Sequence, residues 1–177
     1  MMTRREWLVL AGAAVSGSCG YTLAGRGSFL PSHIQIIAVP VFLNRTPYPT
    51  VEQIFTEKVR VEFQSRGRYT VKPTEEGADA VVRGEIVGIA AAPVAFTDAQ
   101  LATRFRFTVS VGVKLDDVRN KKTLWENPAL SFSDEYDLST RITGAVGVEF
   151  LERERAVVDR LATDLGRSVV QAILEAF

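Results

Sequence analysis

The sequence predicts an α+β fold: a four- to five-stranded sheet, mostly antiparallel or mixed, with two helices packed on one face. Residues 104–115 alternate between apolar and polar side chains, which is typical of a strand with one buried face. Residues 51–66 and 149–176 repeat apolar side chains with helical spacing. Because each helix has one apolar side, covering a single face of the sheet with both is the simplest packing.

The first half of this domain predicts a strand, a helix and two further strands. Residues 34–39 are apolar and β-branched between two prolines, which predicts a strand. A turn-rich segment follows, and Thr50 is placed to cap a helix that Gly67 ends. Residues 68–72 then predict a short strand, and residues 78–92 a longer one.

The second half predicts a hairpin and a long helix. After the alternating strand, residues 116–122 form a polar turn, and residues 123–136 return as a strand. Pro128 within this strand indicates a bulge or an edge position, because proline cannot donate to a sheet. Residues 137–147 contain two glycines and predict a loop, after which the helix over 149–176 completes the domain.

Composition is that of one ordinary folded domain. The chain has 177 residues, of which 46% are hydrophobic and 24% charged. Its 21 basic and 21 acidic residues give a formal net charge of zero. This balance argues against a general nucleic-acid-binding protein, which would carry a basic excess.

The N-terminal segment has the layout of an export signal. Basic residues precede a short apolar run, which is too short to span a bilayer, and small residues lead to Cys19. This arrangement resembles a lipobox, although Ser16 stands where leucine is typical. We therefore expect a signal peptide over 1–18, a lipidated tether over 19–33 and one domain over 34–177. An ordinary secretory signal with an incidental cysteine is the alternative.

Two arginines near the start leave the export route open. Arg4 and Arg5 fit a twin-arginine signal, and they fit equally well the basic region of an ordinary signal peptide.

The sequence offers little material for catalysis. His33 is the only histidine and Cys19 the only cysteine, so a site built from several such ligands is excluded. There is no nucleophile-elbow motif and no phosphate-binding glycine loop outside the export signal. The acidic pairs Asp116–Asp117 and Glu75–Glu76 are predicted to be solvated turn charges. We expect no enzyme, no metal and no cofactor other than a covalent lipid on Cys19.

Four basic residues are candidates for binding a phosphorylated glycolipid. Arg104 and Arg106 project from one side of the alternating strand, and Lys121 and Lys122 follow in the predicted turn. Arginine and lysine pair well with phosphate groups. The alternative is that these charges only protect an edge strand and its turn from aggregation.

Several segments, taken in order, resemble the LPS-assembly lipoprotein family LptE. The resemblance covers nearly all of the chain from Cys19 to Phe177, and the matching pieces share their order and spacing with that family. They are Cys19 to Gly25, Leu30–Pro31, Ile37 to Phe42, Asn44 to Thr46, Ala78 to Ile86, Leu124 to Asn127, Phe132 to Tyr136 and Asp159 to Ala162.

This resemblance implies a lipid-anchored protein on the periplasmic face of the outer membrane. Members place a sheet covered by two helices as a plug inside the β-barrel protein LptD, assist assembly of that barrel and bind lipopolysaccharide. The family's basic lipid-binding residues match no motif here. The only support for a lipid-binding role is therefore the positive charge of the four candidates, Arg104, Arg106, Lys121 and Lys122. Another envelope lipoprotein, acting as a scaffold or secretion-channel subunit, is the alternative function.

Overall fold

The computed structural model describes residues 30–98, 100, 102–137 and 146–177, with side chains described from residue 155 onward in the last helix. The predicted signal peptide, Cys19 and most of the predicted loop over 137–147 therefore lie outside the described residues. In chain order the elements are β1 Ile36–Ala38, β2 Leu43–Asn44, α2 Val51–Ser65, β3 Thr70–Lys72, β4 Ala80–Phe96, β5 Ala102–Asp117, β6 Lys122–Asp137 and α3 Val146–Glu175.

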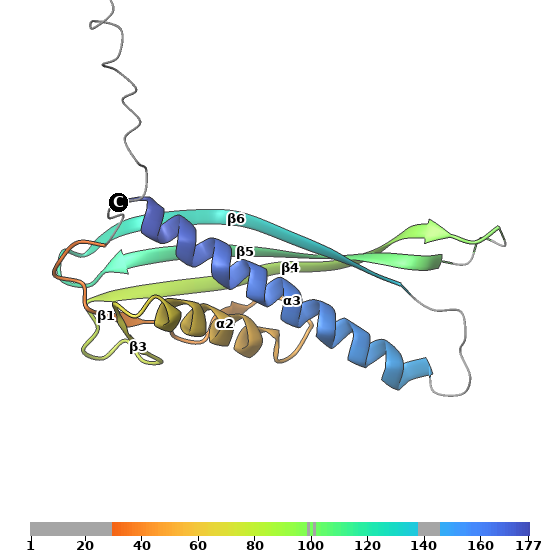
Figure 1. The fold of residues 1–177 in the computed structure, drawn as a ribbon, viewed down its shortest axis with the longest axis horizontal. Coiled ribbons are helices and arrows are strands. Elements are labelled where there is room, and N and C mark those ends of the chain that lie inside the picture. Colours follow the sequence, from red (N-terminus) through yellow and green to blue (C-terminus); the bar gives the residue numbers. More distant parts are fainter. Residues whose placement is uncertain (1–29, 99, 101, 138–145) are drawn as a thin grey trace, which may run out of the picture.

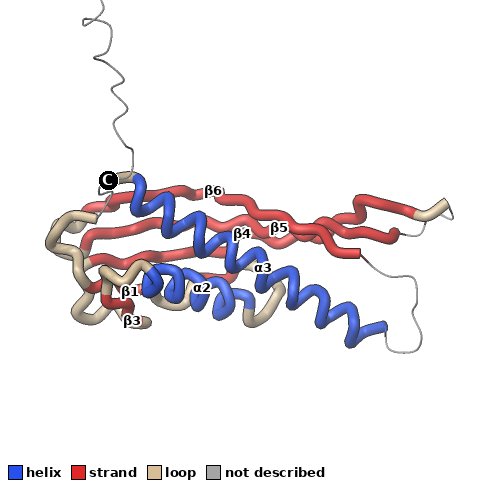
Figure 2. The backbone as a smooth tube through the Cα atoms, in the orientation of Figure 1, coloured by secondary structure: helices blue, strands red, loops and turns tan. Residues whose placement is uncertain are grey.

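The strands form one mixed sheet of six strands with two helices on one face (Figures 1 and 2). The order is β3-β1-β4-β5-β6, and β2 pairs separately with β4. β1 runs parallel to β3 and β4, whereas β4, β5 and β6 form an antiparallel meander. The predicted fold class is confirmed. The additional strand, β2, has only two residues and is too short to show periodicity.

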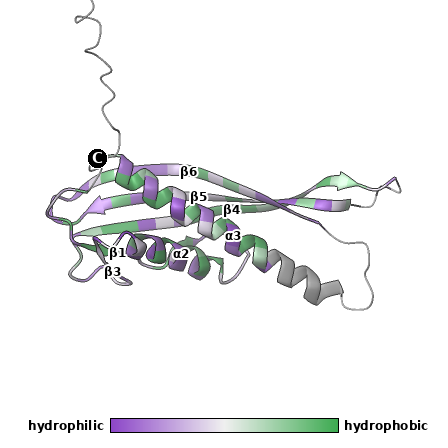
Figure 3. Cartoon of the chain, viewed as in Figure 1, coloured by the Kyte–Doolittle hydropathy of each residue, from purple (hydrophilic) through white to green (hydrophobic). Residues whose placement is uncertain are grey.

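The alternation of β5 divides its residues between the two faces of the sheet. Phe107, Val109 and Leu115 are fully buried beneath the helices. The residues between them, such as Arg106, Ser110 and Lys114, point to the opposite face, which the described helices leave uncovered. Both helices carry hydrophobic and hydrophilic residues (Figure 3), and their buried positions have the predicted spacing.

The two helices also pack tightly against one another. Phe55 and Phe63 of α2 and Leu165 of α3 are fully buried in the same core cluster. At Gly166 the backbone of Lys58 approaches to 3.1 Å of the place where a Cβ would stand. The absence of a side chain at this glycine therefore permits the close crossing.

Thr50 begins α2, but its side chain makes no capping bond. Its backbone is left-handed, with φ at 70°, and its carbonyl oxygen accepts hydrogen bonds from the Gln53 and Ile54 N–H groups. Gly67 follows the helix with φ at +67°, as expected for a glycine that ends a helix.

The β5–β6 turn is shorter than predicted. The strands extend through Asp117 and resume at Lys122, so only residues 118–121 form the turn. The reason is that the Asp117 side chain accepts a hydrogen bond from the Asn120 N–H group, which closes the turn locally. Pro128 lies on the edge strand β6 beside a register shift, which confirms both predicted features.

No helix among the described residues combines the length and apolar character needed to cross a membrane.

One glycine of β4 makes room for an aromatic ring. The buried ring of Phe42 lies closer to the position that a Cβ atom of Gly84 would occupy than real Cβ atoms approach their neighbours. Gly88, further along the same strand, has open space at the corresponding position.

We predict that Gly84→Ala lowers the free energy of unfolding by about 1–3 kcal/mol, because the added methyl group displaces the Phe42 ring. Gly88→Ala serves as the matched control and should change stability little. Urea denaturation of both variants provides the measurement. Equal stability of the two variants would contradict the packing described at Phe42.

Candidate functional site

The four predicted lipid-binding residues lie at opposite ends of the sheet. Arg104 and Arg106 are near the start of β5, whereas Lys121 and Lys122 are at the turn that follows its end. Arg104 and Asp117 are 13 positions apart along the extended strand β5, which corresponds to roughly 40 Å at about 3.3 Å per residue. The four residues therefore form two separate basic pairs.

The arginine pair is neutralised by carboxylates of the neighbouring strand. Arg104 Nε lies 2.7 Å from Asp137 Oδ1, and Arg106 Nη2 lies 2.7 Å from Glu135 Oε1. The hydrogen bond to Asp137 raises the pKa of Arg104. All four side chains are exposed, so a phosphate could reach the arginines only by competing with these carboxylates.

The lysine pair has no such partners. Lys121 and Lys122 are exposed, and within the described part of the chain neither ammonium group has an ion-pair partner. Arg119 lies in the same turn and is also exposed, so it adds a third cation to the turn.

Beneath this turn lies a buried carboxylate that sequence reasoning placed in solvent. Asp117 is 1% exposed, and its Oδ2 atom lies 2.8 Å from Nε2 of His33, which donates the hydrogen bond. The backbone and side-chain amides of Asn120 donate to the same carboxylate at 3.0 and 2.7 Å. The backbone hydrogen bond from Asn120 is the main reason that the pKa of Asp117 falls to about 2, with His33 contributing further. The prediction of a solvated turn charge was wrong for Asp117.

The His33–Asp117 pair joins the end of the predicted tether to the far end of β5, 84 residues later. A second aspartate binds the backbone of the same segment. Asp79 Oδ2 accepts hydrogen bonds from the N–H groups of Gln35 and Ile36 at 3.0 and 2.9 Å. These bonds lower the pKa of Asp79. Two carboxylates thus fix the segment that enters β1.

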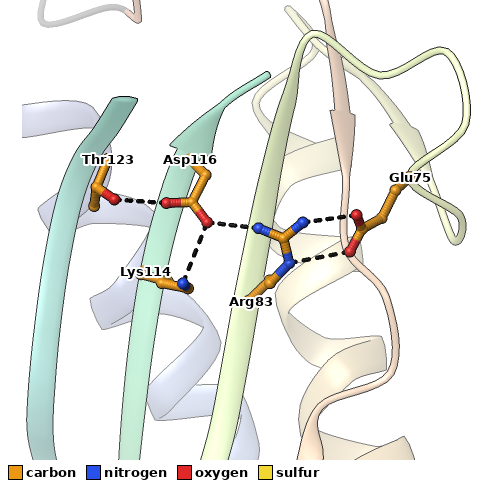
Figure 4. Close-up of polar contacts among 5 residues, drawn as sticks. All are labelled: Glu75, Arg83, Lys114, Asp116 and Thr123. Carbon is orange, nitrogen blue, oxygen red and sulfur yellow. Dashed lines mark hydrogen bonds and ion pairs between the residues drawn. The ribbon is translucent and has the colours of Figure 1, made fainter. Parts of the chain in front are cut away.

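A polar network occupies the uncovered face beside this end of the sheet. Figure 4 shows Arg83 of β4 held between Glu75 and Asp116. Glu75 accepts two hydrogen bonds from the guanidinium group at 3.1 and 2.6 Å, and Asp116 accepts one at 2.5 Å. Lys114 Nζ lies 3.5 Å from Asp116, and Thr123 donates to Asp116 at 2.7 Å.

Within this network the hydrogen bond to Glu75 raises the pKa of Arg83. Burial opposes ionisation of Asp116, but Thr123 and the charges of Lys114 and Arg83 outweigh it and lower the pKa of that carboxyl group. Glu75 and Asp116 were predicted as solvated turn charges. Glu75 is exposed, whereas Asp116 is only 19% exposed, and both carboxylates bind Arg83, which ties the β3–β4 loop to the long strands. Sequence spacing does not reveal this pairing.

A groove of about 570 Å³ lies next to this network. Gly112 and Pro128 are among its lining residues, beside the register shift between β5 and β6. Apolar side chains line one part of it, and charged side chains from β4, β5 and β6 line the rest. No group of three or more metal-ligating side chains occurs among the described residues.

The fold is that of small bacterial lipoproteins of known structure. It is similar to uncharacterized lipoprotein B from Nitrosomonas europaea, with a TM-score of 0.51, 14% identity, and coverage of 85% of this chain and 90% of that one. A minor lipoprotein from Acinetobacter baumannii is similar with a TM-score of 0.52 and 11% identity, and the match covers 81% of this chain and 93% of that one. The rare lipoprotein B from Shewanella oneidensis is similar with a TM-score of 0.50 and 10% identity, and the match covers 78% of this chain and 96% of that one. None of the curated proteins matches the chain significantly.

The family model LptE, described as lipopolysaccharide-assembly, matches residues 34–173. The chain belongs to this family, as its sequence resemblance indicated. Its members are non-enzymatic lipoproteins of the Gram-negative envelope, and the chain has a role in lipopolysaccharide assembly.

We predict that Asp117→Asn lowers the free energy of unfolding at pH 7 by about 1–3 kcal/mol, because a buried acceptor of several hydrogen bonds loses its charge. The pKa of about 2 lies below the unfolded value of about 3.9. The stabilisation by Asp117 is therefore complete above about pH 4 and is lost as the pH falls toward 2.

The measurement is urea denaturation of wild type and variant at pH 7, 5 and 3. The difference between them should be equal at the two higher pH values and smaller at pH 3. Asp98→Asn, at an exposed aspartate, is the control. A difference that does not depend on pH would contradict the role given to the Asp117 charge.

Proposed function

We propose that this protein is an outer-membrane lipoprotein, anchored through Cys19, that binds an LptD-type β-barrel as a plug. In this position it assists assembly of the barrel and transport of lipopolysaccharide to the cell surface. The observation that carries the proposal is the match of the LptE family model over residues 34–173. The lipid on Cys19 is the only added group that the proposal requires.

The uncovered face of the sheet supports a plug role. Hydroxyl side chains face one another across β5 and β6 in two rows, Ser110 opposite Ser131 and Thr108 opposite Ser133. The Arg104 and Arg106 ion pairs continue this polar surface toward the distal end. The lumen of a membrane β-barrel is polar, so a face of hydroxyls and balanced charges suits it.

The lysine pair is the better candidate for contact with lipopolysaccharide phosphates. Lys121 and Lys122 are exposed and unpaired among the described residues, whereas each arginine already has a carboxylate partner. A basic residue near an anionic lipid surface contributes about 1 kcal/mol.

An affinity pull-down from detergent-solubilised outer membranes tests the proposed function. We expect the tagged full-length protein to recover one large β-barrel protein in equal amounts, identified by mass spectrometry. Recovery of the protein alone would contradict the plug role. Recovery of a secretion-channel assembly would instead favour the alternative of an envelope scaffold subunit.

A second experiment tests the lysine pair. We predict that Lys121→Gln with Lys122→Gln weakens binding of labelled lipopolysaccharide about tenfold, because two unpaired positive charges are lost. The matched variant Glu135→Gln with Asp137→Asn frees both arginines and should leave affinity unchanged. Stronger binding by this variant, with no effect of the lysine changes, would place the site at the arginines.

A further inference from the structure

The groove on the uncovered face exposes an apolar cluster. The side chains of Val41, Leu43 and Val87 line it and are 57%, 50% and 48% exposed. Val41 and Leu43 come from the segment around β2, and Val87 lies at the register shift in β4 between Ile86 and Gly88. Exposed apolar side chains gathered beside a groove are typical of an interaction site.

The charges of the groove disfavour a phosphate group. Glu75, Glu85 and Glu126 line it together with Arg83 and Lys114, so the carboxylates outnumber the cations. Arg83 is held by Glu75 and Asp116, and Lys114 lies 3.5 Å from Asp116, so an anion would have to compete with these carboxylates for either cation. The occupant is therefore not the phosphorylated part of lipopolysaccharide.

One carboxylate of the groove remains available. Glu85 is paired with Arg45 at 2.6 Å, whereas Glu126 of β6 is exposed and has no ion-pair partner within the described residues. A ligand that places a positive charge near Glu126 and an apolar group near Val87 would match both parts of the groove.

The backbone beside the groove favours a polypeptide ligand. β2 pairs with β4 only at Glu85 and Ile86, and beyond Ile86 no described strand lies on that side of β4. Free N–H and C=O groups on such an edge can bond an extended chain. Pro93 and the register shifts near it limit such pairing to the stretch close to the groove.

We propose that this groove binds an extended segment of the barrel partner that presents a bulky apolar side chain next to a lysine or arginine. The apolar side chain packs on Val41, Leu43 and Val87, and the cation pairs with Glu126. The identity of the partner rests on the proposed function, whereas the chemistry of the ligand rests on the groove itself.

Site-specific photocrosslinking in whole cells tests this inference on the full-length protein. A photoreactive residue replaces Val87 in the groove or Val61, which is 50% exposed on α2. We expect the Val87 variant to form an adduct containing a peptide of the barrel protein. Adding Glu126→Lys should lower the yield of this adduct about tenfold, the effect of losing one well-placed charge pair.

Two controls separate the groove from the rest of the surface. Glu126→Lys should leave any adduct at Val61 unchanged, and Asp164→Lys, at an exposed carboxylate of α3, should leave the Val87 adduct unchanged. A Val87 adduct with lipid only or with a second copy of this chain would overturn the inference, as would an adduct insensitive to Glu126→Lys. The wild-type pull-down decides the plug role independently of these outcomes.

Discussion

The burial of one face of the β4–β5–β6 meander beneath two helices is the constraint on which the other features depend. It requires the strict alternation of β5, and it places the charged and hydroxyl-bearing residues of three strands together on the opposite face. It also brings the two helices together at Gly166 and places the ring of Phe42, from the segment between β1 and β2, against Gly84, so a side chain at either glycine would collide. The polar face and the groove are consequences of this one-sided packing.

The distribution of charge gives the two ends of the molecule different properties. At the distal end each arginine of β5 is balanced by a carboxylate of β6, so the surface is polar without a strong net field. At the turn end Asp117 is buried and Asp116 is paired with Arg83, whereas the two lysines have no ion-pair partner within the described residues. The proposed phosphate site at the lysines and the proposed polypeptide site at the groove therefore lie at separate places on one small domain.

Local patterns predicted most of the fold. The alternation of residues 104–115 and the helical spacing after Thr50 depend only on neighbours along the chain, so they were visible in the sequence. β2 was missed because two residues carry no period. The burial of Asp117 and the pairing of Arg83 with Glu75 and Asp116 were missed because they depend on segments brought together only by folding. The groove is lined by residues from segments far apart in the sequence, so no single motif predicts it.

The position of β1 has a consequence for the order of folding. This strand inserts between β3 and β4, and its entry segment is fixed by Asp79 and Asp117, residues that follow it by 43 and 84 positions. The meander, in contrast, is built from hairpins between neighbouring strands. Contacts near in sequence form sooner than distant ones. The first strand of the sheet, although it precedes the other strands in the chain, therefore docks only after nearly the whole sheet has formed.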